Sequence, residues 1–169
     1  DFNGCCLRAP WIMEKDDFKY TLSFGNDVFG GPRWCDLVGA KKADEYVAAG
    51  SVPVMLDAHG DPMLRNFVHV DDLTAAIVAA LGHPAARQQL FNICMDEPVD
   101  YRIMADYLYE TRGLPSVDIP TTFHRTWLDN NKAKFLLDWR PEVDLDDLID
   151  NAWDYERDDD DERKIWYPG

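Results

Sequence analysis

Two helix-type segments of this sequence end at the same kind of signal, a glycine followed two residues later by a proline. The two pairs are Gly82 with Pro84 and Gly113 with Pro115. Glycine suits the left-handed residue that closes a helix, and proline cannot continue one. A short strand-type segment follows each pair, at 89–94 and at 117–119. Strands that alternate with helices in this way predict an α/β fold with at least some parallel pairing.

Other local signals extend this alternation along the chain. Residues 5–13 are apolar and compact, which indicates a buried strand that runs into a loop at Pro10. Residues 52–56 and 63–70 indicate two strands, and the turn-forming residues 58–62 favour a hairpin between them. Helices are expected at 72–81, 100–112 and 132–137, capped by Asp71, by Asp100 and by Asp129 or Asn130, with further helices at 34–49 and 145–157 and a long loop at 14–33.

Composition limits the class of protein. The 169 residues are enough for one domain, and 46% of them are hydrophobic, so a disordered chain is not expected. The formal net charge of −15 opposes binding to nucleic acid or to an anionic membrane surface. The longest apolar stretch, 75–81, is much shorter than a membrane span. We therefore expect a cytoplasmic protein with no nucleic-acid or membrane partner, and a solvated acidic tail region at 154–164.

The amino terminus and the cysteines agree with that location. Nothing at the start resembles a signal peptide, and the first residue is Asp1 rather than Met, so we expect a fragment of a longer protein. The four cysteines show no Cys-x-x-Cys spacing, which argues against a zinc site. Reduced and mostly buried thiols are expected at Cys5, Cys6, Cys35 and Cys94.

Several catalytic and cofactor-binding motifs are missing from the sequence. It contains no glycine-rich dinucleotide fingerprint, no P-loop and no Tyr-x-x-x-Lys. None of its three serines, at positions 23, 51 and 116, stands in a nucleophile-elbow context. The sequence therefore predicts no site for a dinucleotide pyrophosphate, no metal site and no catalytic residue within this chain.

Arg65 is the most informative polar residue. It is a single cation flanked by apolar residues within the turn, strand and helix segment 57–72. A guanidinium in apolar surroundings needs an anionic partner, which is either a phosphate or carboxylate ligand or an internal salt bridge. His69 is expected to bond the backbone or Asp71 rather than to act in acid–base chemistry. Asp71 and Asp72 are expected to cap and stabilise the following helix rather than to bind a metal.

A second candidate binding segment is Phe123-His-Arg-Thr-Trp-Leu-Asp129. His124, Arg125 and Trp127 place an imidazole, a cation and an aromatic plane within four residues of a predicted loop. Such a combination can hold a sugar or a nucleotide base by stacking and hydrogen bonds. The alternative is a surface loop with Trp127 inserted into the core. The remaining candidates for stacking, Trp139, Trp153 and Trp166, are expected to be packing residues.

Four segments together resemble the extended short-chain dehydrogenase/reductases, the NAD-dependent epimerase/dehydratase family. Leu7-Arg-Ala-Pro10 is similar to the family's "LRPP" strand end, and 64–73 (LRNFVHVDDL) is similar to "xRDFVHVDDL". Leu90-Phe-Asn-Ile93 followed by Glu97-Pro-Val-Asp-Tyr101 resembles "FNIG" and "EPVSY", and 128–141 resembles "DxSKAKxxLGWxP". The four segments occur in the family's order and cover residues 7 to about 155.

The resemblance implies the carboxy-terminal, substrate-binding portion of such an enzyme: an incomplete Rossmann-like α/β lobe over 1–169, with 1–13 and 89–94 as strands of the shared sheet. The family's amino-terminal half binds NAD or NADP and carries the catalytic Tyr-x-x-x-Lys pair, so this chain alone is expected to bind no cofactor and to be inactive. Arg65, Arg125, Trp127 and His124 are the expected substrate-binding residues, and Ala9, Pro10 and Trp11 the expected cofactor-proximal ones. The implied substrate is a sugar or nucleotide sugar.

The sequence also departs from the family pattern. Ile12-Met-Glu-Lys15 replaces "VYGP", Asn66 stands where the family has Asp, and 123–127 replaces a Gly-Asp-Leu-like segment. These departures leave a sugar without a nucleotide, another polyol or a keto acid open as the substrate. A stand-alone, non-catalytic binding or assembly module is the alternative function. Because strands near Leu7 and Phe91 would have an unpaired edge, we expect a homo-oligomer or a segment that covers the edge.

Overall fold

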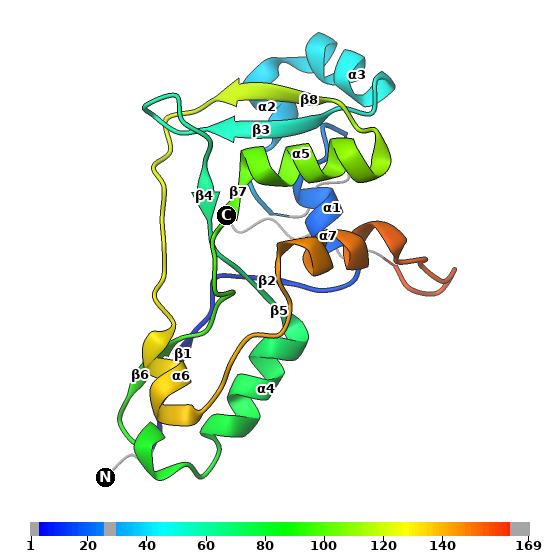
Figure 1. The fold of residues 1–169 in the computed structure, drawn as a ribbon. Helices are drawn as coiled ribbons and strands as arrows, with labels where there is room; N and C mark the ends of the chain where they lie inside the picture. The colour runs from blue at the N-terminus through cyan, green and yellow to red at the C-terminus, as the bar shows by residue number, and fades with distance from the viewer. Residues whose placement is uncertain (1–3, 26–29, 163–169) are drawn as a thin grey trace. The chain divides into compact units, whose positions relative to one another are not determined.

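The computed structural model describes residues 4–25 and 30–162, and they form an α/β fold of short strand pairs and helices (Figure 1). The chain divides into two compact units, which are described separately. Unit 1 comprises 1–14, 64–99 and 126–148, and unit 2 comprises 15–63, 100–125 and 149–169. The expected α/β class is confirmed. Every helix in the described ranges is too short or too polar to cross a bilayer.

Unit 1 is built on short strands that pair mainly in parallel. Strand β1 (Cys6–Arg8) pairs in parallel with β6 (Leu90–Asn92), β2 (Trp11–Met13) pairs in parallel with β5 (Phe67–His69), and β4 (Leu64–Arg65) pairs with β7 (Val99–Asp100). The strand expected over 5–13 is therefore two strands, with a break at Ala9 and Pro10. Proline lacks the N–H that a continuous ladder would need, which explains the break at this position.

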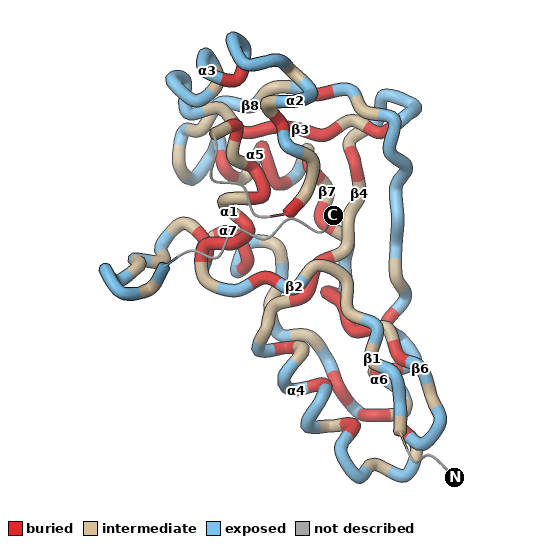
Figure 2. The backbone as a smooth tube through the Cα atoms, turned by 180° about the vertical axis from the view of Figure 1, so that it is seen from behind, coloured by how far each residue is buried: buried red, intermediate tan, exposed pale blue. Residues whose placement is uncertain are grey.

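Helix α4 (Val70–Ala80) packs one face against the core of unit 1, as the alternation of buried and exposed residues along it shows (Figure 2). Ala76 is fully buried on that face. Ala86 of η1 (Pro84–Ala86) and Ala133 and Leu137 of α6 (Asn131–Leu137) belong to the same core. Its other buried members are Val68, Ala80, Phe91, Ile93 and Trp139. Trp139 is thus a packing residue, as expected, and its indole N–H donates to the carbonyl of Asp72 at 3.0 Å.

The cap of α4 differs from the expectation. His69 is the N-cap residue, and its Nδ1 accepts a hydrogen bond from the backbone N–H of Asp71 at 3.4 Å. The carboxylate of Asp72 is buried and accepts from the backbone N–H groups of Glu142 at 2.8 Å and Val143 at 3.2 Å. The prediction that Asp71 caps this helix was therefore wrong, because His69 supplies the acceptor two residues earlier. Asp72 fixes the segment that follows α6 instead.

Unit 2 contains the longest strand pair. Strand β3 (Val52–Leu56) pairs in parallel with β8 (Ser116–Pro120), and α5 (Tyr101–Arg112) packs against β3. Asp100 caps α5 as expected, since its Oδ1 accepts from the N–H of Arg102 at 2.7 Å, and Gly113 closes the helix with φ of 67°. The remaining helices are α1 (Asp17–Thr21), α2 (Trp34–Val38), α3 (Ala40–Ala48) and α7 (Leu145–Asp154), the last of which begins in unit 1.

Three expectations for unit 2 need correction. The loop expected over 14–33 contains α1, and the helix expected over 34–49 is broken at Gly39, whose φ is 82°. The hairpin expected between 52–56 and 63–70 does not form, because β3 takes β8 as its partner and keeps only an isolated antiparallel bridge from Leu56 to Pro62. These errors concern pairings or breaks that local composition does not encode.

Candidate functional site

Arg65 in unit 1 lies over the indole ring of Trp11. Its Cζ is 4.3 Å from the ring centroid, and the ring in turn meets Phe67 edge-on at 5.9 Å between centroids. The parallel pairing of β2 with β5, in which Trp11 is the register partner of Phe67, places these side chains together. A guanidinium at this distance from an indole face is held by cation–π attraction and stacking. The stack on Trp11 therefore gives Arg65 a defined position.

The hydrogen-bonding capacity of Arg65 is incompletely used. Its NH1 atom is buried and has no hydrogen-bond partner among residues 4–25 and 30–162. Leaving a buried donor unsatisfied costs roughly 1–3 kcal/mol, and more for a charged group. Of the two partners that the sequence left open, the internal salt bridge is not formed within those residues. A guanidinium with an unsatisfied N–H group can bind an oxyanion such as a carboxylate or a phosphate.

Of the three residues predicted to lie near a cofactor, Ala9, Pro10 and Trp11, one contacts this arginine. Trp11 is in direct contact with Arg65, while Ala9 and Pro10 form the break between β1 and β2. His69, at the end of β5, is committed to the N-terminus of α4 and lies 3.4 Å from the Asp71 carboxylate. The structure therefore brings Trp11 and Arg65 together and gives His69 the structural role expected for it.

In unit 2, Arg125 is bound by carboxylates. Its Nε lies 3.0 Å from Asp57 Oδ2, and its NH2 lies 3.4 Å from Asp61 Oδ2. His124 is close to His59, with 6.0 Å between ring centroids. Burial works to raise the pKa of Asp57, but the backbone N–H groups of His59 and Asp61 and the Arg125 guanidinium outweigh it, so the pKa lies below its ordinary value. With two carboxylates on one guanidinium, this cluster is not arranged for an anionic ligand.

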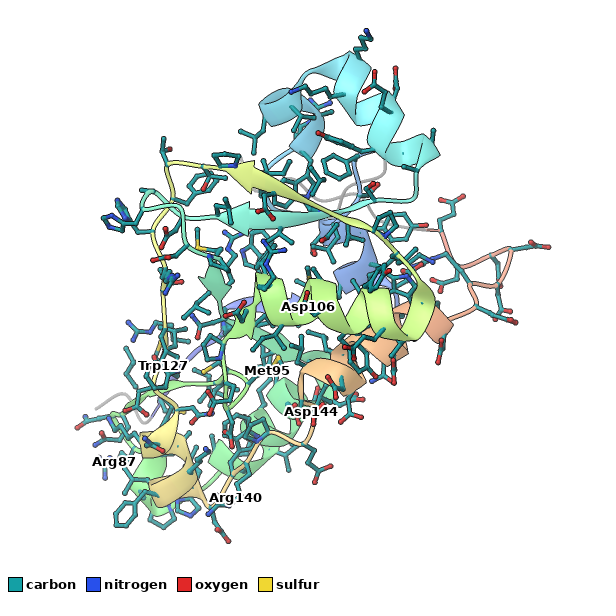
Figure 3. The ribbon with its side chains drawn as sticks, turned by 45° about the horizontal axis from the view of Figure 1, so that its top comes forward. Arg87, Met95, Asp106, Trp127, Arg140 and Asp144 are labelled. Carbon is teal, nitrogen blue, oxygen red and sulfur yellow. The ribbon has the colours of Figure 1, made fainter. Side chains whose placement is uncertain are left out.

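Trp127, the remaining predicted substrate residue, lies in unit 1 on the extended segment that leads into α6 (Figure 3). Its side chain is 68% exposed, so the alternative of a tryptophan inserted into the core is not what the structure shows. It borders a pocket of about 210 Å³. Polar residues form most of the remaining lining: Asp96, Glu97, Asp129, Asn130, Asn131 and Lys134. Apart from Trp127, the sequence analysis assigned no site here, although Glu97 and residues 129–134 lie within two of the segments that resemble the family. These two segments are distant in the sequence and form the pocket only in the folded chain.

Cofactor and metal sites were tested against the residues present. A dinucleotide pyrophosphate needs a glycine-rich turn between a strand and a helix, and the sequence contains none. The chain's own residues therefore do not fit NAD or NADP as a complete binding site. Across 4–25 and 30–162, no group of three or more His, Cys, Asp or Glu side chains is arranged to hold a metal ion.

Among known proteins, solved structures match this chain in fold, whereas sequence comparisons find no match. No protein-family model matches the sequence, and no curated protein matches it. Solved structures do match. A short-chain dehydrogenase/reductase superfamily protein from Agrobacterium tumefaciens with bound NAD superposes with a TM-score of 0.69 at 22% identity, over 89% of this chain and 49% of that one. UDP-glucuronic acid 4-epimerase from Bacillus cereus, in complex with UDP-glucuronic acid and NAD, gives 0.58 at 20% identity, over 89% and 44%.

A third structure, UDP-glucose 4-epimerase from Thermotoga maritima with UDP-glucose, gives a TM-score of 0.57 at 20% identity, over 88% of this chain and 44% of that one. The chain thus spans about half the length of the solved structures that it matches. Its fold is that of part of these solved structures, a short-chain dehydrogenase/reductase superfamily protein and two UDP-sugar 4-epimerases. The resemblance carried by the four sequence segments is confirmed at the level of the fold.

Proposed function

We propose that this chain is the substrate-binding portion of an NAD(P)-dependent enzyme that modifies a sugar or nucleotide sugar, and that Arg65 binds an anionic group of that substrate. The observation that supports this role most directly is the buried NH1 of Arg65, which has no hydrogen-bond partner in the described part of the chain although the guanidinium is held in place by Trp11. A phosphate or carboxylate oxygen would satisfy that donor. The solved structures of the same fold with UDP-sugars make a diphosphate the first ligand to test.

The chemistry would come from residues outside this chain. When bound, the nicotinamide cofactor accepts and returns a hydride, and the Tyr-x-x-x-Lys pair expected upstream serves in proton transfer. This chain would contribute binding and orientation of the substrate, which lowers the barrier by placing the reacting carbon correctly. Ala9, Pro10 and Trp11 remain the residues proposed to lie nearest the cofactor. Arg125 and His124 remain proposed substrate residues, although the contacts of Arg125 with Asp57 and Asp61 argue for a structural role.

Calorimetric titration of the chain with UDP, with UDP-glucose and with NAD⁺ tests the proposal. UDP and UDP-glucose should bind, and Arg65→Gln should remove most of that affinity because a neutral amide cannot pair with a phosphate. Arg87→Gln is the matched control, since it removes an exposed arginine of the same unit. Equal affinities for the two variants would refute the role of Arg65. NAD⁺ binding of sub-millimolar affinity would contradict the proposed dependence on a separate cofactor domain.

We also propose that other polypeptide covers the apolar surface beside β1. Among the described strands β1 pairs only with β6, and an open hollow of about 610 Å³ lies next to it. Its wall includes Leu7 of β1 and Ile77 and Leu81 of the α4 region, and Leu81 is 73% exposed. Exposed apolar surface and an unpaired strand edge favour association. Light scattering should show a dimer or larger species, and a monomer at all concentrations would count against this proposal.

A further inference from the structure

The extended segment that carries Trp127 is clamped by the side chain of Asn66. Asn66 Nδ2 donates to the carbonyl of Thr126 at 2.7 Å, and Asn66 Oδ1 accepts from the N–H of Leu128 at 2.9 Å. The N–H of Thr126 also donates to the carbonyl of Leu64 at 3.3 Å. A carboxamide offers a donor and an acceptor at once, whereas an ionised aspartate offers acceptors alone. The backbone is therefore fixed on both sides of Trp127 by the residue that departs from the family pattern.

This fixed backbone presents an exposed indole. Trp127 is 68% exposed, although burial of a tryptophan is normally strongly favourable. Trp127 instead lines the polar pocket of about 210 Å³. That volume lies below the roughly 300–1,000 Å³ typical of pockets for drug-sized ligands. The pocket therefore suits a single ring rather than a nucleotide sugar.

Part of the pocket lining is an ordered polar network. Asp96 Oδ1 accepts from Lys134 Nζ at 2.5 Å and from Asn130 Nδ2 at 3.0 Å, and Asn130 Nδ2 is also 2.9 Å from the carbonyl of Cys94. Desolvation works to raise the pKa of Asp96, but these hydrogen bonds and the Lys134 charge outweigh it and lower the pKa. Asp96 is therefore an ionised acceptor held in a fixed orientation.

The charges of the pocket select against anions. Its lining contains three carboxylates, those of Asp96, Glu97 and Asp129, and one ammonium, that of Lys134. A phosphate placed there would meet a net negative charge. Hydroxyl groups, in contrast, can donate to carboxylate oxygens, and the weakly polar C–H face of a sugar ring can pack on an indole.

We propose that this pocket binds a single pyranose ring without a phosphate, stacked on Trp127 and held through its hydroxyls by Asp96 and Glu97. Arg65 does not line the pocket. The site is therefore separate from the one under the proposed function and does not depend on the cofactor or on a diphosphate. Asn66 is a positioning residue here, because it sets the backbone of Trp127 without lining the pocket.

The test is an NMR titration of the chain labelled with ¹⁵N, using the methyl glycosides of glucose, galactose and mannose as probes. The indole N–H signal of Trp127, identified by its loss in Trp127→Phe, should shift saturably with at least one of them. Backbone amides of Asp96 and Lys134 should shift in the same titration, and Trp127→Ala should abolish those shifts. Glucose 1-phosphate should bind at least several-fold more weakly than methyl glucoside. The absence of saturable shifts with all three glycosides, or tighter binding of glucose 1-phosphate, would overturn the proposal.

Further variants distinguish glycoside binding in this pocket from ligand binding at Arg65 and from loss of the fold. Asn66→Asp replaces the donor to Thr126 by a charged acceptor oxygen that repels its carbonyl, and should weaken glycoside binding by at least about fivefold to tenfold, the loss expected for one hydrogen bond. Arg65→Gln should leave glycoside binding unchanged while it removes UDP binding, so either proposal can fail alone. Unchanged thermal unfolding of Trp127→Ala would show that its loss of binding does not reflect loss of the fold. Unaltered glycoside binding by Trp127→Ala would contradict the proposal directly.

Discussion

The guanidinium of Arg65 is stacked on the indole of Trp11, with 4.3 Å from Cζ to the ring centroid. This contact orders a long side chain that would otherwise lose rotamer entropy on meeting a ligand. It does so without an anionic partner from the described part of the chain, and one nitrogen, NH1, is left without an acceptor. Trp11 therefore orders the Arg65 side chain and leaves an N–H group for an external anion, whereas an internal salt bridge would occupy the N–H groups of the guanidinium.

Replacement of Trp11 tests this preparation. Trp11→Leu should weaken UDP binding by about twofold to fivefold, the equivalent of a cation–π contact of roughly 0.5–1 kcal/mol. Trp11→Phe keeps an aromatic face under the guanidinium and should lose less. Calorimetry gives the affinities, and thermal unfolding controls for the lost edge contact with Phe67. Equal UDP affinity in all three proteins would show that the stack does not prepare the arginine.

The sequence predicted the local features of the fold better than its pairings. Asp100 and Gly113 bound α5 as expected, because a cap and a left-handed glycine act within one turn of the chain. The partner of β3 could not be predicted in the same way, since β8 lies about 60 residues further along and the turn at 58–62 favoured a nearer partner. The prediction that the thiols are mostly buried was also wrong, since Cys94 is buried whereas Cys5 and Cys6 are exposed.

Only those residues of the candidate site whose type stood out from their sequence neighbours could be predicted. Arg65 was identified because a lone cation stood in an apolar segment, but its stack on Trp11 depends on the parallel pairing of β2 with β5. The function of Asn66 could not be read from its position, since it depends on a backbone segment some 60 residues away. Long-range hydrogen bonds of this kind require the fold before they can be recognised.

The carboxylate of Asp72 should contribute strongly to stability. It is buried and accepts hydrogen bonds from the backbone N–H groups of Glu142 and Val143, which join the start of α4 to the segment after α6. Asp72→Ala leaves both donors without their partner and should lower the free energy of unfolding by roughly 2–4 kcal/mol. Urea denaturation followed by circular dichroism measures the loss. Asp71→Ala, at an exposed neighbour, is the matched control and should have a much smaller effect.

Cys94 should be the least reactive thiol of the chain. Burial first, and then the charges of Asp96 and Asp129, raise its pKa to about 11, with Lys134 opposing them. Because the thiolate is the nucleophile, iodoacetamide at pH 8 should modify the exposed Cys5 and Cys6 well before Cys94. Mass spectrometry of peptides after timed labelling gives the order. Modification of Cys94 at the rate of Cys5 in the folded protein would contradict this assignment.

The pairing of Asp57 with Arg125 should make unit 2 sensitive to acid. Burial works against the charged carboxylate, but the N–H groups of His59 and Asp61 and the Arg125 guanidinium together lower its pKa in the folded chain. A lowered pKa means that the unfolded state takes up the proton first, so the stabilisation is present above the ordinary aspartate pKa of about 3.9 and is lost as the pH falls below it toward the folded value. Thermal unfolding between pH 7 and pH 3 should therefore show a decline below about pH 4 that is reduced in Asp57→Asn. Arg102→Gln, which removes a guanidinium paired with the more exposed Asp118, is the control and should leave most of the decline in place. An acid decline of equal size in Asp57→Asn and the unmodified chain would show that other carboxylates cause it.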